Sequence, residues 1–258
     1  MKPFVITVAR GYGSGGKTIG KMLAEDLGVK YYDMELLRLA SDESGINEHL
    51  FAEADEKLKT PRLFKPRKSA YTGEVIPPDS EDFVSDQNLF NYQAKVIRDL
   101  AEKESCVIIG RCADFVLKDY KNVVRVYVHA PFDYCVEKTM MVHGNMDEEE
   151  AKRYIRKVDK RRGDYYLYFT GRDWHNADNY DLCLNSSDLG WEKCVAKEKV
   201  FMKINLGDKG RFWFKKPPQV FFFETRGGAF IDVEWQRPFH ISRGRPRIPS
   251  SPGKQISL

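Results

Sequence analysis

The sequence contains no run of 18 apolar residues, so we expect no membrane-spanning helix. Its first residues form a strand-like segment and lack the charged and then apolar layout of a secretory signal peptide. The five cysteines are odd in number and scattered, and they lack the C-x-x-C spacing of metal sites. Together these absences favour a reduced, cytoplasmic compartment, in which the thiols serve as small core residues.

The sequence also lacks a strong excess of charge of one sign, because 42 Lys and Arg stand against 38 Asp and Glu. The net charge of +4 is unevenly distributed: residues 207–258 contain ten Lys and Arg against four Asp and Glu. Residues 1–206 are therefore nearly neutral, and the global charge gives no signal for nucleic-acid binding. With 258 residues, the chain is long for one domain and short for two large ones.

A phosphate-binding motif lies near the N-terminus. The apolar run Phe4–Ala9 predicts a buried strand, and the spacing of apolar residues predicts an amphipathic helix over Lys17–Leu27. The glycine-rich turn between them matches the pattern G-x-x-x-x-G-K-[ST] at each of its fixed positions, Gly11, Gly16, Lys17 and Thr18. Glycines allow successive N–H groups to point at a phosphate, and the helix N-terminus adds a positive dipole.

This pattern predicts a site for ATP and Mg²⁺. Lys17 is expected to reach the β- and γ-phosphates and to act in catalysis, and the hydroxyl of Thr18 is expected to bind the metal ion. The expected cofactor-binding residues are the whole loop, Gly11, Tyr12, Gly13, Ser14, Gly15, Gly16, Lys17 and Thr18.

The same turn carries a competing motif. Gly11, Gly13 and Gly16 also spell G-x-G-x-x-G, and Asp33 follows a second predicted strand, Val29–Tyr32, about where the ribose-binding acid of a dinucleotide site belongs. Lys17 and the threonine after it favour the phosphate loop, because a dinucleotide site has no use for a lysine aimed at phosphates. A protein-kinase glycine loop fits less well, since no H-R-D or D-F-G follows.

Strands and helices alternate along the chain, which predicts an α/β fold with a doubly wound parallel sheet. The further predicted strands are Cys106–Gly110, Val123–His129 and a short last strand that starts near Tyr180 and contains Leu182–Leu184. The further predicted helices are Glu35–Ala40, Glu48–Leu58, Phe83–Glu104, Ala113–Tyr120, one starting after Pro131, one from Glu148 to about Lys160, and Trp191–Met202. Ligands bind beyond the carboxyl ends of such strands, where the phosphate loop, Asp33 and Arg111 are all expected.

Two segments are candidates for closing over this edge. Residues 46–82 are polar and interrupted by prolines, which suits either a substrate-gripping insertion or a solvated loop. Residues 152–175 form a candidate lid, whose cations lie at helical spacings: Arg153, Arg156, Lys157, Lys160, Arg161 and Arg162. Arginines of a closing lid stabilise the charge of phosphoryl transfer, so Arg161 and Arg162 are expected to be catalytic. A solvated helix face and an RNA-binding surface are the alternatives.

Five segments in this order resemble the cytidylate kinase-like proteins, which are bacterial relatives of cytidylate kinase among the nucleoside monophosphate kinases. They are the phosphate loop, Tyr-Tyr-Asp33, Ile-Ile-Gly-Arg-Cys-Ala-Asp114, Asp-Lys-Arg-Arg-Gly-Asp-Tyr-Tyr, and Asp173-Trp174 before Asn-Tyr-Asp-Leu-Cys-Leu-Asn-Ser-Ser. The resemblance covers residues 3–200. It implies a P-loop kinase fold with a lid and a monophosphate-binding insertion, and transfer of the γ-phosphoryl group of ATP to a nucleoside monophosphate, CMP or dCMP.

The resemblance also implies roles for single residues. Asp33 and Arg111 would face the acceptor nucleotide, and Asp164 would belong to the lid and contact substrate beside the two arginines already named. Asp114 and Trp174 match family positions. Residues 46–82 do not reproduce the larger insertion of typical cytidylate kinases, which leaves the acceptor base open. No aspartate of Walker-B type appears, so the second contact of Mg²⁺ is water or Asp33.

The organisation expected from these observations is a kinase domain over residues 1–200 and a basic, aromatic tail over 201–258. The tail is either a hairpin-like appendage or an extension without folded structure. Two other functions stay open, a nucleotide-sensing module without transfer and a P-loop kinase for another small-molecule acceptor. The expected partner is the nucleoside monophosphate substrate, with no membrane, no specific nucleic acid, and a monomer or weak oligomer.

Overall fold

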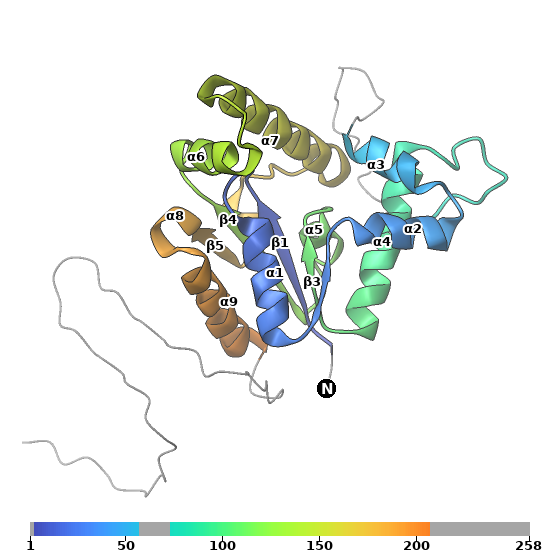
Figure 1. The fold of residues 1–258 in the computed structure, drawn as a ribbon. Helices are drawn as coiled ribbons and strands as arrows, with labels where there is room; N and C mark the ends of the chain where they lie inside the picture. Colours follow the sequence, from blue (N-terminus) through green and yellow to red (C-terminus); the bar gives the residue numbers. More distant parts are fainter. Residues whose placement is uncertain (1–2, 57–72, 207–258) are drawn as a thin grey trace, which may run out of the picture. The chain divides into compact units, whose positions relative to one another are not determined.

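The computed structural model describes residues 3–56 and 73–206. Within these ranges lies one sheet of five parallel strands in the order β2-β3-β1-β4-β5, with helices on both faces (Figure 1). The strands are β1 (Val5–Arg10), β2 (Lys30–Tyr32), β3 (Cys106–Ile109), β4 (Val123–His129) and β5 (Leu182–Asn185). This arrangement confirms the predicted doubly wound parallel sheet.

The helices follow the predicted order. They are α1 (Gly16–Leu27), α2 (Glu35–Ser44), α3 (Glu48–Glu56), α4 (Asp86–Lys103), α5 (Ala113–Val116), α6 (Phe132–His143), α7 (Glu148–Thr170), α8 (Ser186–Leu189) and α9 (Trp191–Leu206), with a short 3₁₀ helix at Ala177–Asn179. In the described part of the chain, none of them is both long enough and apolar enough to cross a membrane.

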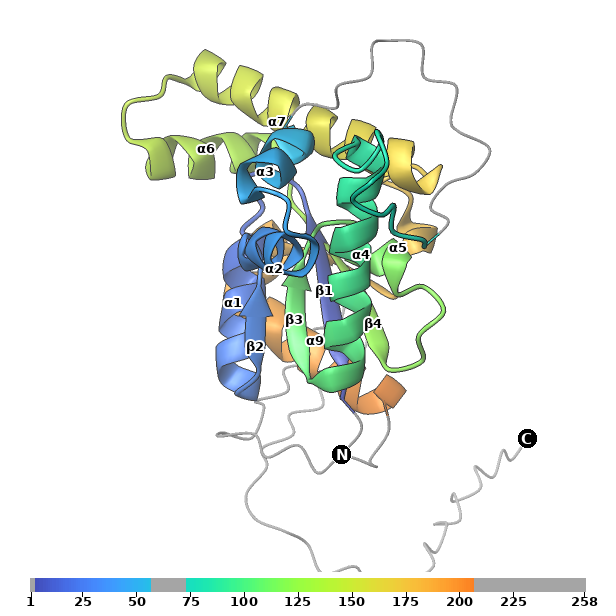
Figure 2. The same cartoon turned by 90° about the vertical axis from the view of Figure 1, so that its right-hand side faces the viewer.

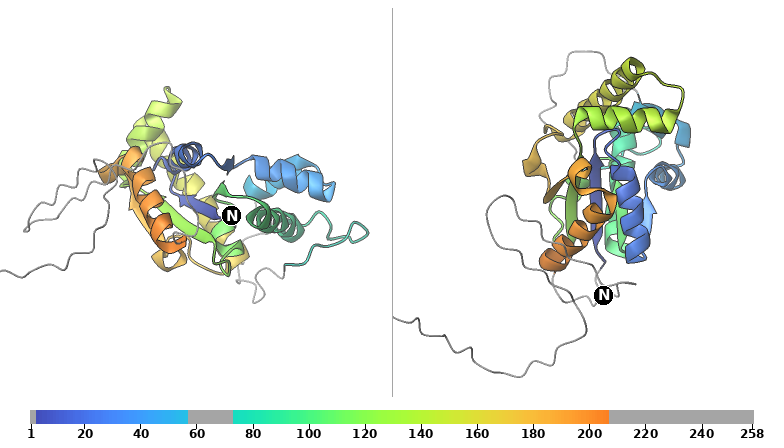
Figure 3. Two further views of the ribbon diagram at one scale, coloured as in Figure 1. Left: turned by 90° about the horizontal axis from the view of Figure 1, so that it is seen from below. Right: turned by 60° about the vertical axis from the view of Figure 1, so that its left-hand side comes forward.

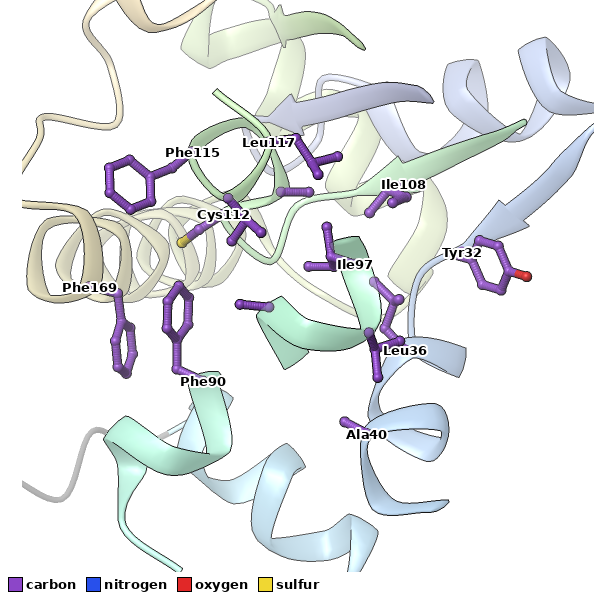
Figure 4. Close-up of a cluster of buried hydrophobic side chains, with 14 of the residues drawn as sticks. Tyr32, Leu36, Ala40, Phe90, Ile97, Ile108, Cys112, Phe115, Leu117 and Phe169 are labelled. Atoms are coloured by element: carbon purple, nitrogen blue, oxygen red, sulfur yellow. The ribbon is translucent and has the colours of Figure 1, made fainter. Parts of the chain in front are cut away.

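The core has two layers because successive strand residues point to opposite faces of the sheet. Ile6 and Val8 of β1 pack with Ile19 and Leu23 of α1 on the face that α9 also covers. Val5 and Ala9 of β1 point to the opposite face, where they belong to a layer that includes residues of α2, α4, α5 and α7 (Figures 2 and 4). Each fully buried aliphatic side chain of this kind stabilises the fold by roughly 1.5–3 kcal/mol.

The long helix α7 extends ten residues beyond its predicted end near Lys160. It begins at a capping box, in which the side chain of Asp147 accepts the N–H of Glu150 at 2.8 Å. It ends at Gly171, whose φ of 68° is left-handed. The extension forms because Tyr165, Tyr166 and Phe169 are buried, and Phe169 stacks on Phe90 of α4 with ring centroids 4.2 Å apart.

Two other predictions need comment. The helix predicted over Ala113–Tyr120 is wrong in length, since α5 ends at Val116 and the chain then turns toward β4. Part of the predicted insertion, residues 57–72, lies outside the described residues. Most of the predicted tail, residues 207–258, also lies outside them. The segment after residue 73 is held to α4, where Asn88 accepts the N–H of Ile76 at 2.7 Å.

Candidate active site

The carboxyl ends of the strands open into a cavity of about 410 Å³. Figure 3 shows α6 and α7 lying across this end of the sheet. The cavity is lined by residues from β1, the phosphate loop and the start of α1, the β2–α2 and β3–α5 junctions, α3, α7 and the segment after α7. They are Arg10, Tyr12, Lys17, Asp33, Met34, Ala52, Gly110, Arg111, Cys112, Arg161, Arg162, Tyr165 and Trp174. Among the described lining residues, five are cationic and only Asp33 is acidic, so the cavity attracts anions.

The phosphate loop adopts a conformation that requires glycine. Gly13 and Gly15 both have a φ of 79°, in the left-handed region. A Cβ at Gly13 would lie 2.5 Å from the carbonyl oxygen of Cys135, and one at Gly15 would lie 2.5 Å from Nε1 of Trp191. The hydroxyl of Ser14 turns inward and donates to the carbonyl of Gly11 at 2.8 Å. Ser14 therefore stabilises the loop through its side chain.

The loop presents N–H donors that the protein itself does not use. Among the described residues, no acceptor is found for the backbone N–H groups of Gly13, Gly15, Lys17 and Thr18. The first turn of α1 has no acidic residue and no side-chain cap. Unused donors at a helix N-terminus suit the oxygens of a phosphate. The residues present thus fit the triphosphate of ATP.

The loop leaves room for a metal ion as well. Thr18 is exposed in the first turn of α1, where its hydroxyl is free to meet a cation held by phosphates. Within the described ranges, no group of three or more His, Cys, Asp or Glu is placed to bind a metal. Mg²⁺ is often held by one or two protein oxygens together with phosphates and water, so a single threonine ligand suits it.

Lys17 and Asp33 meet at the cavity. The Nζ atom of Lys17 lies 2.7 Å from an oxygen of Asp33, and the Lys17 side chain remains 65% exposed. Asp33 is buried, with a side-chain exposure of 10%, and Arg10 approaches its other oxygen at 4.0 Å. The aspartate therefore holds the lysine over the loop, and the lysine keeps the freedom to move to a phosphate.

Arg111 reaches the cavity through an unusual turn at the end of β3. Gly110, Arg111 and Cys112 have φ values of 67°, 58° and 53°, three left-handed residues in succession. For residues with a side chain, this conformation costs roughly 1–2 kcal/mol each. The guanidinium of Arg111 contacts the sulfur of Met34 at 3.1 Å. Such strain is typical of functional sites, which agrees with the role expected for Arg111.

The α7 residues predicted for the lid separate into two groups. Arg161 and Arg162 line the cavity, and for Arg161 no ion-pair partner occurs among the described residues. Asp164 does not line it, because its carboxylate pairs with Lys160 at 2.5 Å, one turn back along the helix. The structure thus brings together every predicted catalytic and acceptor-binding side chain except Asp164.

Sequence reasoning missed several residues of this site. Arg10 lies at the end of β1, directly before the loop, and its place at a strand end could have identified it. Asp159 is an acid within a basic run, and it accepts the backbone N–H of Tyr12 at 2.9 Å. Trp174 was not missed, since the resemblance matched it without giving it a role, and the structure places it in the cavity wall, edge-on to Tyr127 with ring centroids 5.7 Å apart.

A buried hydrogen bond ties α5 to α7 behind the cavity. The hydroxyl of Tyr166 donates to a carboxylate oxygen of Asp114 at 2.6 Å. Burial raises the pKa of Asp114 from 3.8 to about 6, and the hydrogen bond from Tyr166 opposes that increase. Asp114 follows the left-handed turn, so this bond helps to hold Arg111 in place.

We expect Tyr166→Phe to lower the free energy of unfolding by about 1–3 kcal/mol, because a buried carboxylate loses a donor. Asp114 has a raised pKa when folded, so its contribution to stability falls as the pH rises from 3.8 toward 6. Without Tyr166 this decline continues above pH 6. In urea unfolding, the free energy of unfolding of Tyr166→Phe should therefore fall further below that of wild type at pH 7.5 than at pH 5. Tyr134→Phe is the control variant. Equal losses at both pH values would contradict the role of the hydrogen bond.

The family model described as the cytidylate kinase-like family matches residues 5–188. A search among curated proteins gives no match. A solved structure of an uncharacterized protein from Eubacterium ventriosum ATCC 27560 is 24% identical, with a TM-score of 0.57, and the match covers 78% of this chain and 98% of that one. It shares the fold.

Two further solved structures are more distant. A shikimate kinase from Bacteroides thetaiotaomicron is 15% identical, with a TM-score of 0.45 and coverage of 78% of this chain and 98% of that one. A gluconokinase from Sinorhizobium meliloti 1021 is 13% identical, with a TM-score of 0.44 and coverage of 79% and 94%. The family match spans most of the chain and includes the phosphate loop, the Arg111 turn and α7. The chain therefore belongs to the cytidylate kinase-like family.

Proposed function

We propose that this kinase-family protein transfers the γ-phosphoryl group of ATP to a nucleoside monophosphate, CMP or dCMP, and forms ADP and the nucleoside diphosphate. The observation that carries the proposal is a set of loop N–H donors without an acceptor among the described residues, beside a cavity whose described lining contains five cations and one acid. A cavity of about 410 Å³ lies within the range of small-molecule sites, roughly 300–1,000 Å³.

In this proposal the loop amides and Lys17 bind the donor phosphates, and Asp33 orients the lysine through their 2.7 Å contact. Arg161 and Arg162 stabilise the charge that develops on the transferred group. Bound ATP would supply the phosphoryl group, and Mg²⁺ at Thr18 would neutralise phosphate charge. Positioning and charge neutralisation supply most of the rate enhancement in such transfers, so no general base is required.

The acceptor would lie on the side of the cavity formed by Arg111, Asp33 and Trp174. The guanidinium of Arg111 suits an anionic group such as a monophosphate, because its planar donors match phosphate oxygens. Asp33 is buried beside Arg10 and Lys17. Its carboxylate can accept a hydrogen bond from the substrate, or it can bind Mg²⁺ as a second protein ligand. The aromatic rings of Tyr165 and Trp174 supply apolar surface for a base.

An acceptor screen tests the proposal. With ATP and Mg²⁺, coupled release of ADP should be at least tenfold faster with CMP or dCMP than with AMP or GMP, while UMP tests discrimination between the pyrimidines. Release without any acceptor is the control for simple ATP hydrolysis. Turnover only with a non-nucleotide alcohol would overturn the acceptor assignment, and ATP binding without turnover would favour a nucleotide-sensing role.

A further inference from the structure

Asp159 of α7 contacts the phosphate loop from outside the cavity. Both of its carboxylate oxygens accept the backbone N–H of Tyr12, at 2.9 and 3.1 Å. Tyr12 is the second residue of the loop and lies between Gly11 and Gly13. A residue 147 positions further along the chain thus fixes the backbone of the phosphate loop.

The same carboxylate holds Arg162. Nη1 of Arg162 donates to Oδ1 of Asp159 at 3.1 Å and to the carbonyl oxygen of Arg10 at 3.2 Å. Arg10 ends β1, so Arg162 connects α7 to the strand that leads into the loop. Burial raises the pKa of Asp159 and lowers the pKa of Arg162, and each charge is stabilised by the other.

The side chain of Tyr12 extends these contacts to α6. Its hydroxyl lies 3.0 Å from Nε2 of His143, the last residue of α6, and its ring meets Tyr154 of α7 edge-on with centroids 5.1 Å apart. The guanidinium carbon of Arg162 lies 5.6 Å from the centre of the Tyr12 ring. Both helices that cross the strand ends therefore contact one residue of the loop.

We propose that Asp159 is a positioning residue that fixes the distance between the phosphate loop and the arginines of α7. The inference rests on the proposed function, because it concerns how the bound phosphates and these arginines are aligned. A guanidinium has five N–H donors, and the contacts to Asp159 and Arg10 involve Nη1 alone, so its other nitrogens remain able to bind phosphate. Arg161 directly precedes Arg162 on α7 and also lines the cavity, so fixing this part of the helix fixes the backbone of both arginines.

The proposal predicts an effect mainly on the chemical step. Because misalignment of about 1 Å can cost roughly 100-fold in rate, Asp159→Ala should lower kcat by about 30- to 100-fold. Acceptor KM should change less than about threefold, since the proposed acceptor side of the cavity is formed by Arg111 and Asp33, which lie after β3 and β2 and not on α7. Asp159→Asn keeps an oxygen that can accept the Tyr12 N–H, so its kcat should be at least fivefold higher than that of Asp159→Ala.

The experiment compares both variants with wild type and with Glu149→Ala, which removes an exposed acid near the start of the same helix. Steady-state kinetics give kcat and KM, calorimetry gives the affinity for ATP, and thermal unfolding shows that each variant folds. The inference would be overturned if Asp159→Ala had the kcat of wild type, or if the kcat of Asp159→Asn were no higher than that of Asp159→Ala.

Failure of the proposed function would give a different result. If wild type turns over none of the acceptors, calorimetry still tests the positioning role of Asp159, because a fixed loop binds phosphates more tightly than a mobile one. Asp159→Ala should then weaken ATP binding at least fivefold and Glu149→Ala should not. Equal ATP affinity in all four proteins would refute the positioning role by itself.

Discussion

Replacing Lys17 with alanine is expected to reduce kcat/KM for phosphoryl transfer by about 100- to 1,000-fold, the usual effect of removing one charge-stabilising donor. Lys17 follows the glycine-rich turn, and its ammonium lies 2.7 Å from Asp33 at the cavity. No other described lysine lines that cavity, so none replaces it. The measurement is steady-state ADP release with ATP and the best acceptor.

The fold should survive this change. The Lys17 side chain is 65% exposed, and Arg10 remains 4.0 Å from Asp33 as a second cation, so we expect only a small shift in Tm. Lys21→Ala is the matched control, because Lys21 lies one turn further along α1 with its ammonium 3.9 Å from Glu25, away from the cavity. Activity retained by Lys17→Ala, or lost equally in Lys21→Ala, would contradict the role of the phosphate loop.

Replacing Glu198 with methionine is expected to stabilise the protein. Glu198 lies on α9 and is fully buried, and neither of its carboxyl oxygens has a hydrogen-bond partner in the described part of the chain. Burial raises the pKa of Glu198 from 4.5 to about 8. An isolated buried carboxyl is costly in either protonation state, and apolar replacement of buried charged groups is often neutral or stabilising.

The pH dependence identifies this group. The folded state binds the proton of Glu198 more tightly than the unfolded state, so stability falls as the pH rises from 4.5 to about 8. At pH 7 the free energy of unfolding is lower than at pH 4.5 by on the order of 3 kcal/mol because of this group. Glu198→Met should remove this loss, and the Tm at pH 7 should rise by about 6–12 °C.

Denaturant unfolding of wild type and Glu198→Met at pH 5, 7 and 8 measures the effect. The two stabilities should differ least at pH 5 and most at pH 8. Glu192→Gln, an exposed carboxylate at the start of α9, should leave both the stability and its pH dependence nearly unchanged. A difference between wild type and Glu198→Met that does not grow with pH would show that Glu198 does not titrate as a buried carboxyl.

Much of the fold could be predicted from local patterns. The strand Val123–His129 was predicted with its observed bounds, and the helix predicted from Glu148 begins at that residue, where Asp147 caps it. Such features depend on neighbouring residues, through alternating burial or a side chain that accepts an N–H three residues away. The lengths of α5 and α7 could not be predicted in this way, because packing against distant elements decides where these helices end.

The phosphate loop and the alternation of strands and helices follow from local patterns of residues. Together these place Lys17, Asp33 and Arg111 at one edge of the sheet. Which charges of α7 face that edge depends instead on how the helix packs. Asp164 pairs with Lys160 on the helix surface, whereas Asp159 lies against the backbone of Tyr12. A run of charges at helical spacing has no preferred face until the helix packs, and that packing depends on buried side chains far away in the sequence.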